Sequence, residues 1–523
     1  MEYVTASLTE ANHQRPNGTA TLFQKRRRTW SEVAARVSRL AGGLRSLGVE
    51  PGDRVAIWTL NNDRYVELLY AVPWAGAVVV PINTRLAPTE VGLILEDSES
   101  GTLIVDEMSL PLLATTLGGS VNPRVVYGGE GEPPAGTVGY ESLIDHPAID
   151  DAGRGDDDLY GIFYTAGTTG RSKGVMLSHR NIVANMENVA GVLDRVWGKD
   201  EPDTVYLHVA PMFHLADLGS TFSVTARLGT HAVVPRFEPA ETLRAIAEFR
   251  ATAVMMVPTM INMVLQVPDL GCYDLSALRH MTYGASPMPP AVMARAIEVF
   301  PQVSFMQGYG MSELSPVATF LEPQYHVLEG PFSGKLKSAG RAVGTAEVRV
   351  VDGEDRPVPP GAVGEVVVRG PIVMQGYWKQ PELTAQAIRG GWMHTGDAGY
   401  LDEQGFLFIV DRMKDMIISG GENIYSVEVE SAIYGHPAVG MCAVFGVPND
   451  QWGEAVHAVV VLKPETAVTE PELIEFCRNH LTHYKCPRSI TFRNEPMPIS
   501  GAGKILKTEL RAPYWQGRTR AVN

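Results

Sequence analysis

A loop of glycines, hydroxyl side chains and one lysine is the first part of this chain that could do chemistry. It follows a short apolar strand predicted over residues 159–163 and reads Tyr164-Thr165-Ala166-Gly167-Thr168-Thr169-Gly170-Arg171-Ser172-Lys173-Gly174. Glycines let the backbone approach a polyphosphate closely, and successive N–H groups form an anion-binding nest. The threonine hydroxyls and the Lys173 ammonium add further donors. The pattern favours a phosphate-binding loop, with an ordinary surface loop as the alternative.

This loop does not fit the pattern of P-loop NTPases. When Gly167 and Lys173 are placed on GxxxxGK[ST], Ser172 falls on the second glycine and Gly174 on the hydroxyl residue that binds magnesium. Because both positions carry the wrong residue type, we expect a different class of nucleotide-binding protein.

Six further motifs follow the loop in order along the chain. They are Pro211-Met212-Phe213-His214, Tyr283-Gly284-Ala285-Ser286-Pro287, Gln307-Gly308-Tyr309-Gly310-Met311-Ser312-Glu313, Trp392-Met393-His394-Thr395-Gly396-Asp397, Asp411-Arg412-Met413-Lys414-Asp415 and Gly501-Ala502-Gly503-Lys504-Ile505-Leu506-Lys507. With the loop, they resemble the motifs of the acyl-adenylate-forming superfamily, which includes acyl-CoA synthetases, peptide-synthetase adenylation domains and firefly luciferase. The resemblance covers nearly the whole chain. It implies an α/β fold with a large N-terminal domain of layered sheets and helices, residues 1–410, and a small mobile α+β C-terminal domain, residues 411–523.

The resemblance also implies a nucleotide site. The residues assigned to ATP or AMP are Thr165, Ala166, Gly167, Thr168, Thr169, Lys173, Gly284, Ala285, Gln307, Gly308, Tyr309, Ser312, Asp397, Arg412 and Lys504. In this assignment the glycines leave a slot for adenine, Tyr309 stacks on the base, and Asp397 accepts hydrogen bonds from both ribose hydroxyls. Ser312 contacts the α-phosphate. Glu313 and Thr165 are assigned to Mg²⁺, which prefers hard oxygen ligands supplemented by phosphate.

Lys504 is the residue that the resemblance assigns to the first chemical step. A carboxylate that attacks the α-phosphate brings two negative groups together, and an ammonium between them stabilises the developing charge. We interpret His214 as a gate between the acyl pocket and the CoA tunnel. It is not needed as a general base, because the attacking acid is already ionised at neutral pH. Lys414 occupies the hinge position, about which the small domain presents either Lys504 or the Gly420-Gly421 loop.

The acyl pocket and the CoA side are also assigned by resemblance. The acyl-pocket residues are Phe213, His214, Met260, Tyr283, Gly284, Gly308 and Gly310, and the CoA-side residues are Gly420, Gly421 and Glu422. Methionines near position 260 suit an alkyl chain or an aryl ring, although plain core is the alternative. The segment MIISGGENIYSVEVE resembles bacterial fatty-acyl-CoA ligases. Plant coumarate-type ligases carry lysines where Ile418 and Gly420 stand, which weakens a coumarate-type substrate.

These features predict an AMP-forming acid–CoA ligase that uses ATP, Mg²⁺ and CoA. The substrate is a medium- or long-chain fatty acid, or an aryl or arylalkanoic acid. The alternative is a stand-alone adenylation enzyme that loads a carrier protein. A luciferase-like oxidase is less consistent with the sequence, and so is a non-catalytic nucleotide-binding regulator, which would not need Lys504 together with Glu313 and Arg412.

Local patterns predict the elements that position these residues. Before the loop they predict a helix opened by the Thr29…Glu32 capping box and ended near Gly48, a strand over 55–58, a helix over 65–75 that Pro73 ends or kinks, and a strand over 78–80. Beyond residue 401 they predict a strand over 406–410, a helix over 427–434, strands over 440–445 and 455–462, and a helix opened by Thr469…Glu472. Strands that alternate with helices indicate a layered α/β domain.

Composition limits the partners. The chain has 523 residues with a net charge of −15, which argues against nucleic acid. The basic run at residues 25–28 is therefore interpreted as a solvated turn, and the Gly/Pro-rich stretch 128–155 as a surface connection. Four cysteines are too few for a disulfide framework, and no signal peptide or membrane span is visible. We expect a cytoplasmic enzyme and leave a homodimer open.

Overall fold

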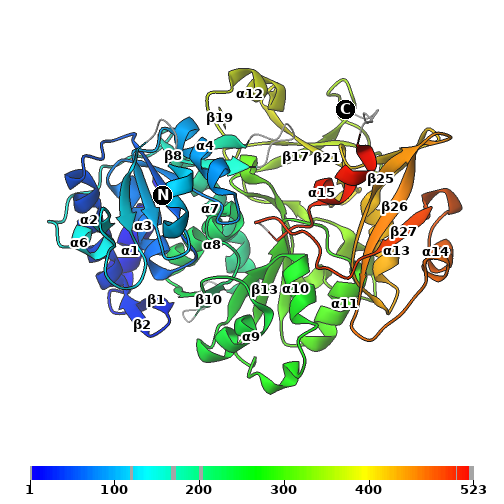
Figure 1. Cartoon of the computed structure of the whole chain (residues 1–523), viewed down its shortest axis with the longest axis horizontal. Helices are drawn as coiled ribbons and strands as arrows, with labels where there is room; N and C mark the ends of the chain where they lie inside the picture. Colours follow the sequence, from blue (N-terminus) through cyan, green and yellow to red (C-terminus); the bar gives the residue numbers. More distant parts are fainter. Residues whose placement is uncertain (1–2, 118–121, 166–171, 199–203, 502, 517–523) are drawn as a thin grey trace.

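The structure is a computed structural model, and it describes residues 3–117, 122–165, 172–198, 204–501 and 503–516. These residues form two large sheets and two smaller ones (Figure 1). The 9-stranded sheet has the order β16-β15-β14-β13-β12-β10-β11-β1-β2 and consists of β1 Thr19–Phe23, β2 Arg26–Thr29, β10 Val205–His208, β11 Thr230–Val233, β12 Ala253–Met256, β13 His280–Gly284, β14 Ser304–Gly310, β15 Val317–Leu321 and β16 Arg341–Ala342. The 8-stranded sheet has the order β19-β9-β8-β4-β3-β5-β6-β7 and consists of β3 Arg54–Trp58, β4 Val78–Pro81, β5 Thr102–Val105, β6 Arg124–Tyr127, β7 Val138–Gly139, β8 Leu159–Thr165, β9 Lys173–Ser178 and β19 Gly376–Tyr377.

The two smaller sheets follow in the second half of the chain. The first contains β17 Glu347–Val351, β18 Gly364–Arg369, β20 Ile388–Arg389, β21 Trp392–Leu401 and β22 Leu407–Arg412. The second contains β23 Ile417–Ser419, β24 Glu422–Ile424, β25 Val439–Asn449, β26 Gly453–Leu462 and β27 Ser489–Phe492. Helices α13 Ser426–Tyr434, α14 Glu470–Arg478 and α15 Lys507–Arg511 accompany this last sheet.

One apolar core joins the two large sheets through a layer of helices. It contains α1 Ala6–Gln14, α2 Trp30–Ser46, α3 Asp63–Trp74, α7 His179–Trp197 and α8 Leu215–Ala226. On β3, Val55 and Ile57 face this core, whereas Ala56 and Trp58 face α4 Pro88–Ser98 on the other side of the sheet. On the 9-stranded sheet a second core contains α9 Pro239–Glu248, α10 Pro258–Val264 and α11 Pro290–Val299. Inner strands such as β4 and β12 are apolar along their whole length because helices cover both of their faces.

The local sequence patterns identified most elements correctly. Both predicted capping boxes form, at Thr29 with Glu32 and at Thr469 with Glu472. Helix α3 contains Pro73 and ends one residue later. The strands predicted over 55–58 and 78–80 are β3 and β4, and those predicted near 440 and 455 are the long hairpin β25–β26. These segments were predictable because their capping and apolar patterns agree with their tertiary packing.

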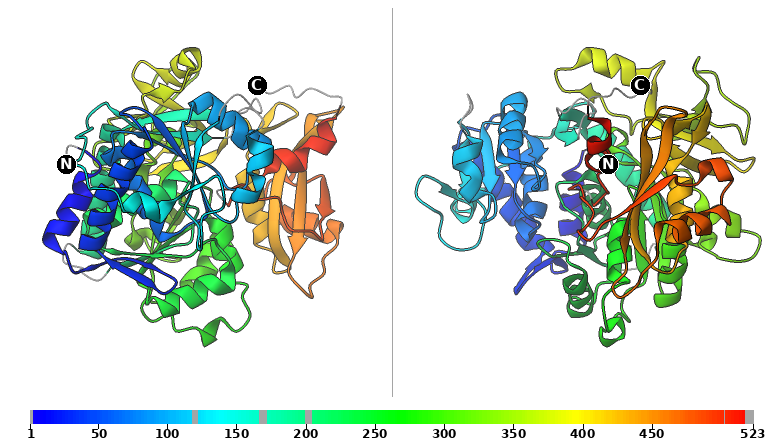
Figure 2. Two further views of the ribbon diagram at one scale, coloured as in Figure 1. Left: turned by 60° about the vertical axis from the view of Figure 1, so that its left-hand side comes forward. Right: turned by 45° about the vertical axis from the view of Figure 1, so that its right-hand side comes forward.

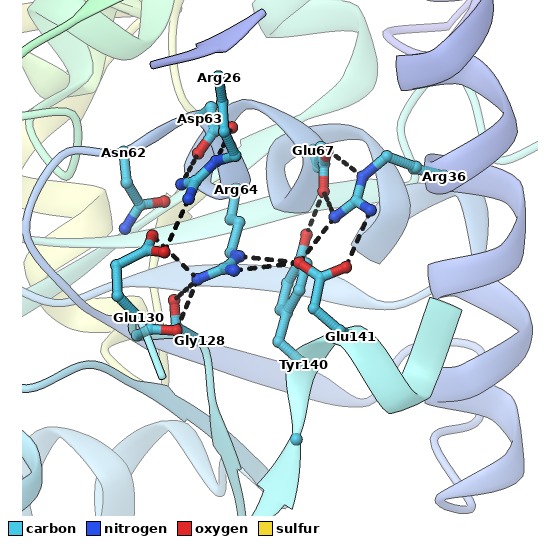
Figure 3. Close-up of polar contacts among 12 residues, drawn as sticks. Arg26, Arg36, Asn62, Asp63, Arg64, Glu67, Gly128, Glu130, Tyr140 and Glu141 are labelled. Atoms are coloured by element: carbon cyan, nitrogen blue, oxygen red, sulfur yellow. Dashed lines mark hydrogen bonds and ion pairs between the residues drawn. The ribbon is translucent and has the colours of Figure 1, made fainter. Parts of the chain in front are cut away.

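The interpretation of the basic run as a solvated turn holds for Lys25, which is exposed in a turn, but is wrong for Arg26 and Arg28. Arg26 and Arg28 lie on β2 and pair with Asp63, whose side chain is only 1% exposed, at the start of α3. Arg26 donates to both Asp63 oxygens, at 3.0 and 2.7 Å. The pairs belong to a larger charge network (Figure 3). The buried Asp63 carboxylate accounts for the gathering of arginines at this place.

The stretch 128–155 is also more than a surface connection. It contains α6 Tyr140–Ile144, whose apolar residues are buried against α2. Glu141 bridges Arg36 of α2 and Arg64 of α3, and the Tyr140 hydroxyl donates to buried Glu67 at 2.8 Å (Figure 3). These contacts connect the segment to helices α2 and α3, and we call α2, α3, α6 and strand β2 the N-terminal lobe.

The C-terminal residues, 411–516, lie against one side of the rest of the chain, which we call the large body (Figure 2). The Arg85 guanidinium donates to the carbonyl oxygens of Ile499 and Ser500, at 3.2 and 2.8 Å. The Asn262 amide donates to the Gly440 carbonyl at 2.9 Å. None of the described helices is both long and apolar enough to cross a membrane.

Asp63→Ala is expected to lower the midpoint of urea unfolding. The change leaves two arginines in a largely buried site without their carboxylate, which costs about 3 kcal/mol or more. Glu298→Ala is the control, because its pair with Arg295 is exposed on both sides and such pairs contribute little. Equal midpoints for the two variants would show that the network does not stabilise the lobe.

Candidate active site

A cleft of about 2000 Å³ lies between the large body and the C-terminal residues. Sixteen of the predicted site residues line it: Thr165, Phe213, His214, Tyr283, Gly284, Ala285, Gln307, Gly308, Tyr309, Gly310, Ser312, Glu313, Asp397, Arg412, Lys414 and Lys504. They come from the carboxyl ends of β13 and β14, from β8, α8, β21 and β22, and from the loop before α15. Strands β13 and β14 are parallel, so their carboxyl ends lie at the same edge of the sheet. This explains how the motifs at residues 283–287 and 307–313 meet.

Some predicted residues lie elsewhere. Met260 is 3% exposed in the core behind the cleft, so it does not line an acyl pocket as predicted; among the methionines predicted near it, Met255 does line the cleft. Lys173 lies beside the cleft wall rather than in it. Ala166, Gly167, Thr168 and Thr169 lie outside the described residues.

The slot predicted for adenine is built by a close approach of two strands. Gly284 of β13 is paired with Gly308 of β14. A Cβ on Gly284 would lie 2.2 Å from the Gly308 carbonyl oxygen, so no other residue fits there. The Tyr283 hydroxyl donates to Gln307 Oε1 at 3.2 Å and lies 3.0 Å from His326 Nε2. These contacts fix the two strand ends that form the slot.

Asp397 is held from two sides in the position predicted for the ribose. The Tyr309 hydroxyl donates to Oδ2 at 2.7 Å, and Arg412 Nε pairs with Oδ1 at 2.8 Å. Asp397 and Arg412 face each other across β21 and β22. Burial raises the pKa of the Asp397 carboxyl, and the Arg412 guanidinium opposes that rise. The sheet register therefore places a charged pair at the cleft wall.

Glu313 is connected to Lys173 through a tyrosine that the sequence analysis did not identify. The Tyr377 hydroxyl donates to Glu313 Oε1 at 2.9 Å, and the Lys173 ammonium lies 5.0 Å from the Tyr377 ring centroid. Tyr377 lies on β19, which pairs with β9, the strand that begins at Lys173. No motif contains Tyr377, and its role follows only from this strand pairing.

Lys504 enters the cleft on a loop that contacts the large body. The Thr259 hydroxyl donates to the Gly503 carbonyl, and a Cβ on Gly501 would lie 2.4 Å from Asn83 Oδ1. Burial, together with the nearby Arg412, lowers the pKa of the Lys504 ammonium to about 8. Asp397 and Glu313 lie close enough to oppose this shift. The charged form of Lys504 is therefore less stable than that of a free lysine, and it lies in the cleft lined by the residues predicted to bind ATP.

His214 caps α8 and is uncharged. Its Nδ1 accepts a hydrogen bond from the Ala216 amide at 3.3 Å, so in the neutral ring the proton is on Nε2. Burial and the Lys504 charge lower the pKa of His214 to about 4. A neutral imidazole whose Nδ1 is engaged by the backbone fits a gate better than a base.

The Gly420-Gly421 loop lies away from the cleft lining. It is the turn of the hairpin β23–β24, in which Ser419 is paired with Glu422. Both glycines have positive φ, +63° and +85°, as a two-residue hairpin turn requires. The structure therefore brings Lys504, and not this loop, to the cleft.

Comparisons with known proteins agree over nearly the whole chain. Residues 8–378 match the family model described as AMP-binding enzyme, and residues 428–504 match AMP-binding enzyme C-terminal domain. The chain is 41% identical to a feruloyl-CoA synthase of Amycolatopsis sp, over 95% of this chain and 96% of the relative. It is 35% identical to the fatty acid–[acyl-carrier-protein] ligase ScoC of Streptomyces coeruleorubidus, over 98% and 96%. The crystal structure of the anthranilate CoA ligase AuaEII in complex with anthranoyl-AMP superposes with a TM-score of 0.89 at 27% identity, covering 98% of this chain and 97% of that one.

Gly284→Ala is expected to abolish nucleotide binding, because the added methyl collides with the Gly308 carbonyl and closes the slot. Gly334→Ala is the matched control. Gly334 also lines the cleft, but a Cβ there meets nothing within 4 Å. Calorimetric titration with ATP, with circular dichroism to confirm folding, separates the two variants. Unchanged ATP affinity in Gly284→Ala would contradict the assignment of this slot to the base.

Proposed function

Because this chain belongs to the AMP-binding enzyme family, we propose from its cleft that it is an AMP-forming acid–CoA ligase. The enzyme activates a carboxylic acid with ATP to give acyl-AMP and pyrophosphate, and the CoA thiol then displaces AMP. The predictions of the superfamily, of the two-part α/β fold and of the acid–thiol ligase class are confirmed by the relatives.

The placement of Lys504 among Asp397, Arg412 and Glu313 is the observation that carries the mechanism. A carboxylate oxygen forms a bond to the α-phosphorus, the bond from that phosphorus to the β-phosphate oxygen breaks, and pyrophosphate leaves with the electron pair. No proton moves in this step. The Lys504 ammonium stabilises the charge shared by the attacking carboxylate and the α-phosphate oxygens. Arg412 and Asp397 hold the nucleoside, so the reacting groups stay aligned.

Mg²⁺ is the metal we propose for this site, held by Glu313. The described residues contain no cluster of three or more acidic, His or Cys side chains that could bind an ion alone. Glu313 supplies one hard carboxylate, held in place by Tyr377 and 6% exposed. One carboxylate supplemented by phosphate oxygens is a common magnesium site. When bound, Mg²⁺ offsets the negative charge of the triphosphate. Thr165 lines the same cleft and stays a proposed second ligand.

We propose that thioester formation uses a second pose of the C-terminal domain. Arg412 ends β22 and Ile417 starts β23, so the segment between them, with Lys414, joins the two parts. We retain the domains 1–410 and 411–523 and Lys414 as the hinge. Rotation there would withdraw Lys504 and bring Gly420, Gly421 and Glu422 toward the cleft as the pantetheine channel.

The acid remains a fatty or an aryl acid in this proposal. The similarity to a feruloyl-CoA synthase, 41% identical to this chain, supports an aryl acid, whereas Ile418 and Gly420 differ from the plant coumarate-type ligases. Loading of a carrier protein stays the alternative acceptor reaction, supported by the similarity to ScoC. A homodimer and a cytoplasmic location stay predictions.

The function is tested with purified protein, ATP, Mg²⁺ and a panel of alkanoic and aryl acids. We expect acid-dependent AMP release that rises when CoA is added, with acyl-CoA as the product. If the rate of AMP release does not change with CoA for any acid, but rises when an acyl carrier protein is added, the protein is a carrier-loading enzyme and not a CoA ligase.

The lowered pKa of Lys504 predicts a pH dependence. The ammonium is the active form, so it is fully present well below pH 8 and is lost as pH rises through about 8. The value of kcat/KM for ATP in pyrophosphate release should therefore fall about tenfold per pH unit above that value. Lys504→Arg should be slower but keep its rate to higher pH, because guanidinium stays charged. A wild-type profile that is level to pH 9.5, or the same fall in both proteins, would contradict the role of this ammonium.

A further inference from the structure

A chain of buried polar contacts crosses the proposed hinge. Asp411 is the first of the C-terminal residues, but it precedes Lys414 and lies on β22, where it is paired with Ala398 of β21. The sheet therefore fixes Asp411 to the large body. Its carboxylate nevertheless binds Ser426, the first residue of α13, which follows the hinge. A rotation at Lys414 would move these two residues apart.

The Asp411 carboxylate accepts hydrogen bonds at the start of α13. The Ser426 amide donates to Oδ2 at 2.5 Å, and the Ser426 hydroxyl donates to Oδ1 at 3.2 Å. Both residues are buried, with Asp411 3% exposed. The first amides of a helix have no acceptor within the helix, and its N-terminus favours a negative charge. Asp411 thus satisfies the end of a helix that lies on the other side of the hinge.

Lys507 extends these contacts to the loop that carries Lys504. Its ammonium donates to Ser426 Oγ at 2.7 Å and pairs with Glu430 Oε1 of α13, also at 2.7 Å. Burial raises the pKa of the Asp411 carboxyl to about 6, and the nearby Lys507 ammonium opposes that rise. Lys507 starts α15, and the loop before this helix carries Lys504. The position of this loop is therefore connected to β22 through a continuous set of polar contacts.

We propose, resting on the function above, that Asp411, Ser426 and Lys507 form a latch that holds the C-terminal domain in the arrangement seen here. We call this arrangement, with Lys504 in the cleft, the adenylation pose. The latch has to open before thioester formation, because Ser426 and Lys507 move with the domain whereas Asp411 stays on β22. The three residues position Lys504 and take no part in the bond changes. Their contacts align the first step and are broken before the second.

The test measures the two half-reactions separately. In Asp411→Asn the charge that attracts Lys507 is lost, so pyrophosphate release in single turnovers without CoA should slow about tenfold. Acyl-CoA formation from CoA and preformed acyl-AMP should stay at the wild-type rate or rise. Lys507→Met keeps most of the side chain but not its charge, and it should change the two rates in the same way. A defect in folding alone would lower both rates.

Lys485→Met is the matched control. The side chains of Lys485 and Lys507 are equally exposed, at 20%. Lys485 also pairs with a glutamate of α13, Glu428, at 2.8 Å. Both members of this pair follow the hinge, so the pair does not depend on the pose. Lys485→Met should therefore leave the rate of pyrophosphate release unchanged.

The pose itself is measured by pulsed electron paramagnetic resonance in the absence of substrates. Spin labels are attached at Glu298→Cys on α11 and Glu475→Cys on α14, because both side chains are exposed. The exposed Cys272 is replaced by serine in this background. Asp411→Asn and Lys507→Met should each add a second distance between the labels, or enlarge its share relative to the protein without these changes.

The latch is overturned if both variants keep the distances of the parent protein, or if the two half-reactions slow equally in both. The proposed function fails in a different way. If the distances shift in the two variants, but the wild-type protein releases no pyrophosphate with any acid of the panel, the latch stands and the acid–CoA ligase is wrong.

Discussion

The Lys504 ammonium is buried close to two other cations, Arg412 and Lys414, and this repulsion constrains the whole site. Burial and Arg412 lower its pKa to about 8, so the free protein holds this charge at a cost. Asp397 and Glu313 oppose the shift, and each already has a partner, Arg412 and Tyr377 respectively. A polyphosphate and a carboxylate would relieve the repulsion. The cleft is therefore prepared for anions even though the protein as a whole carries a net charge of −15.

The same cation ties the chemistry to the arrangement of the two parts of the chain. Lys504 reaches the cleft because Thr259 and Arg85 of the large body hold the backbone just before it, at Gly503 and Ser500. These two contacts are hydrogen bonds to backbone carbonyl oxygens, and Tyr434 of α13 also packs against the core of the 9-stranded sheet. The Gly420-Gly421 hairpin lies outside the cleft in this arrangement. Adenylation needs Lys504 in the cleft, and thioester formation then needs room there for the CoA thiol. A C-terminal domain that moves between these two steps would meet both needs.

The motifs identified residues that line one cleft, because most of the motifs lie at strand ends or turns that meet there. Gly284 is an example: it is visible as glycine in the sequence, and in the structure a Cβ there would lie 2.2 Å from the Gly308 carbonyl oxygen. Tyr377 could not be predicted, because its contact with Glu313 depends on the pairing of β19 with β9, two strands far apart in sequence. Arg26 and Arg28 were misjudged for the same reason, since their carboxylate partner, Asp63, lies on another element.

The account is tested most directly by fixing the two parts of the chain in the arrangement seen here. A Cβ on Gly501 would almost touch the side chain of Asn83, so Asn83→Cys with Gly501→Cys should form a disulfide across the interface, in a background where exposed Cys272 is replaced by serine. We predict that the oxidised protein forms acyl-AMP and pyrophosphate but no thioester, and that reduction restores thioester formation; the single variants serve as controls. Thioester formation at an undiminished rate in the fully oxidised protein would show that Lys504 need not leave the cleft, and the two-pose mechanism would be wrong.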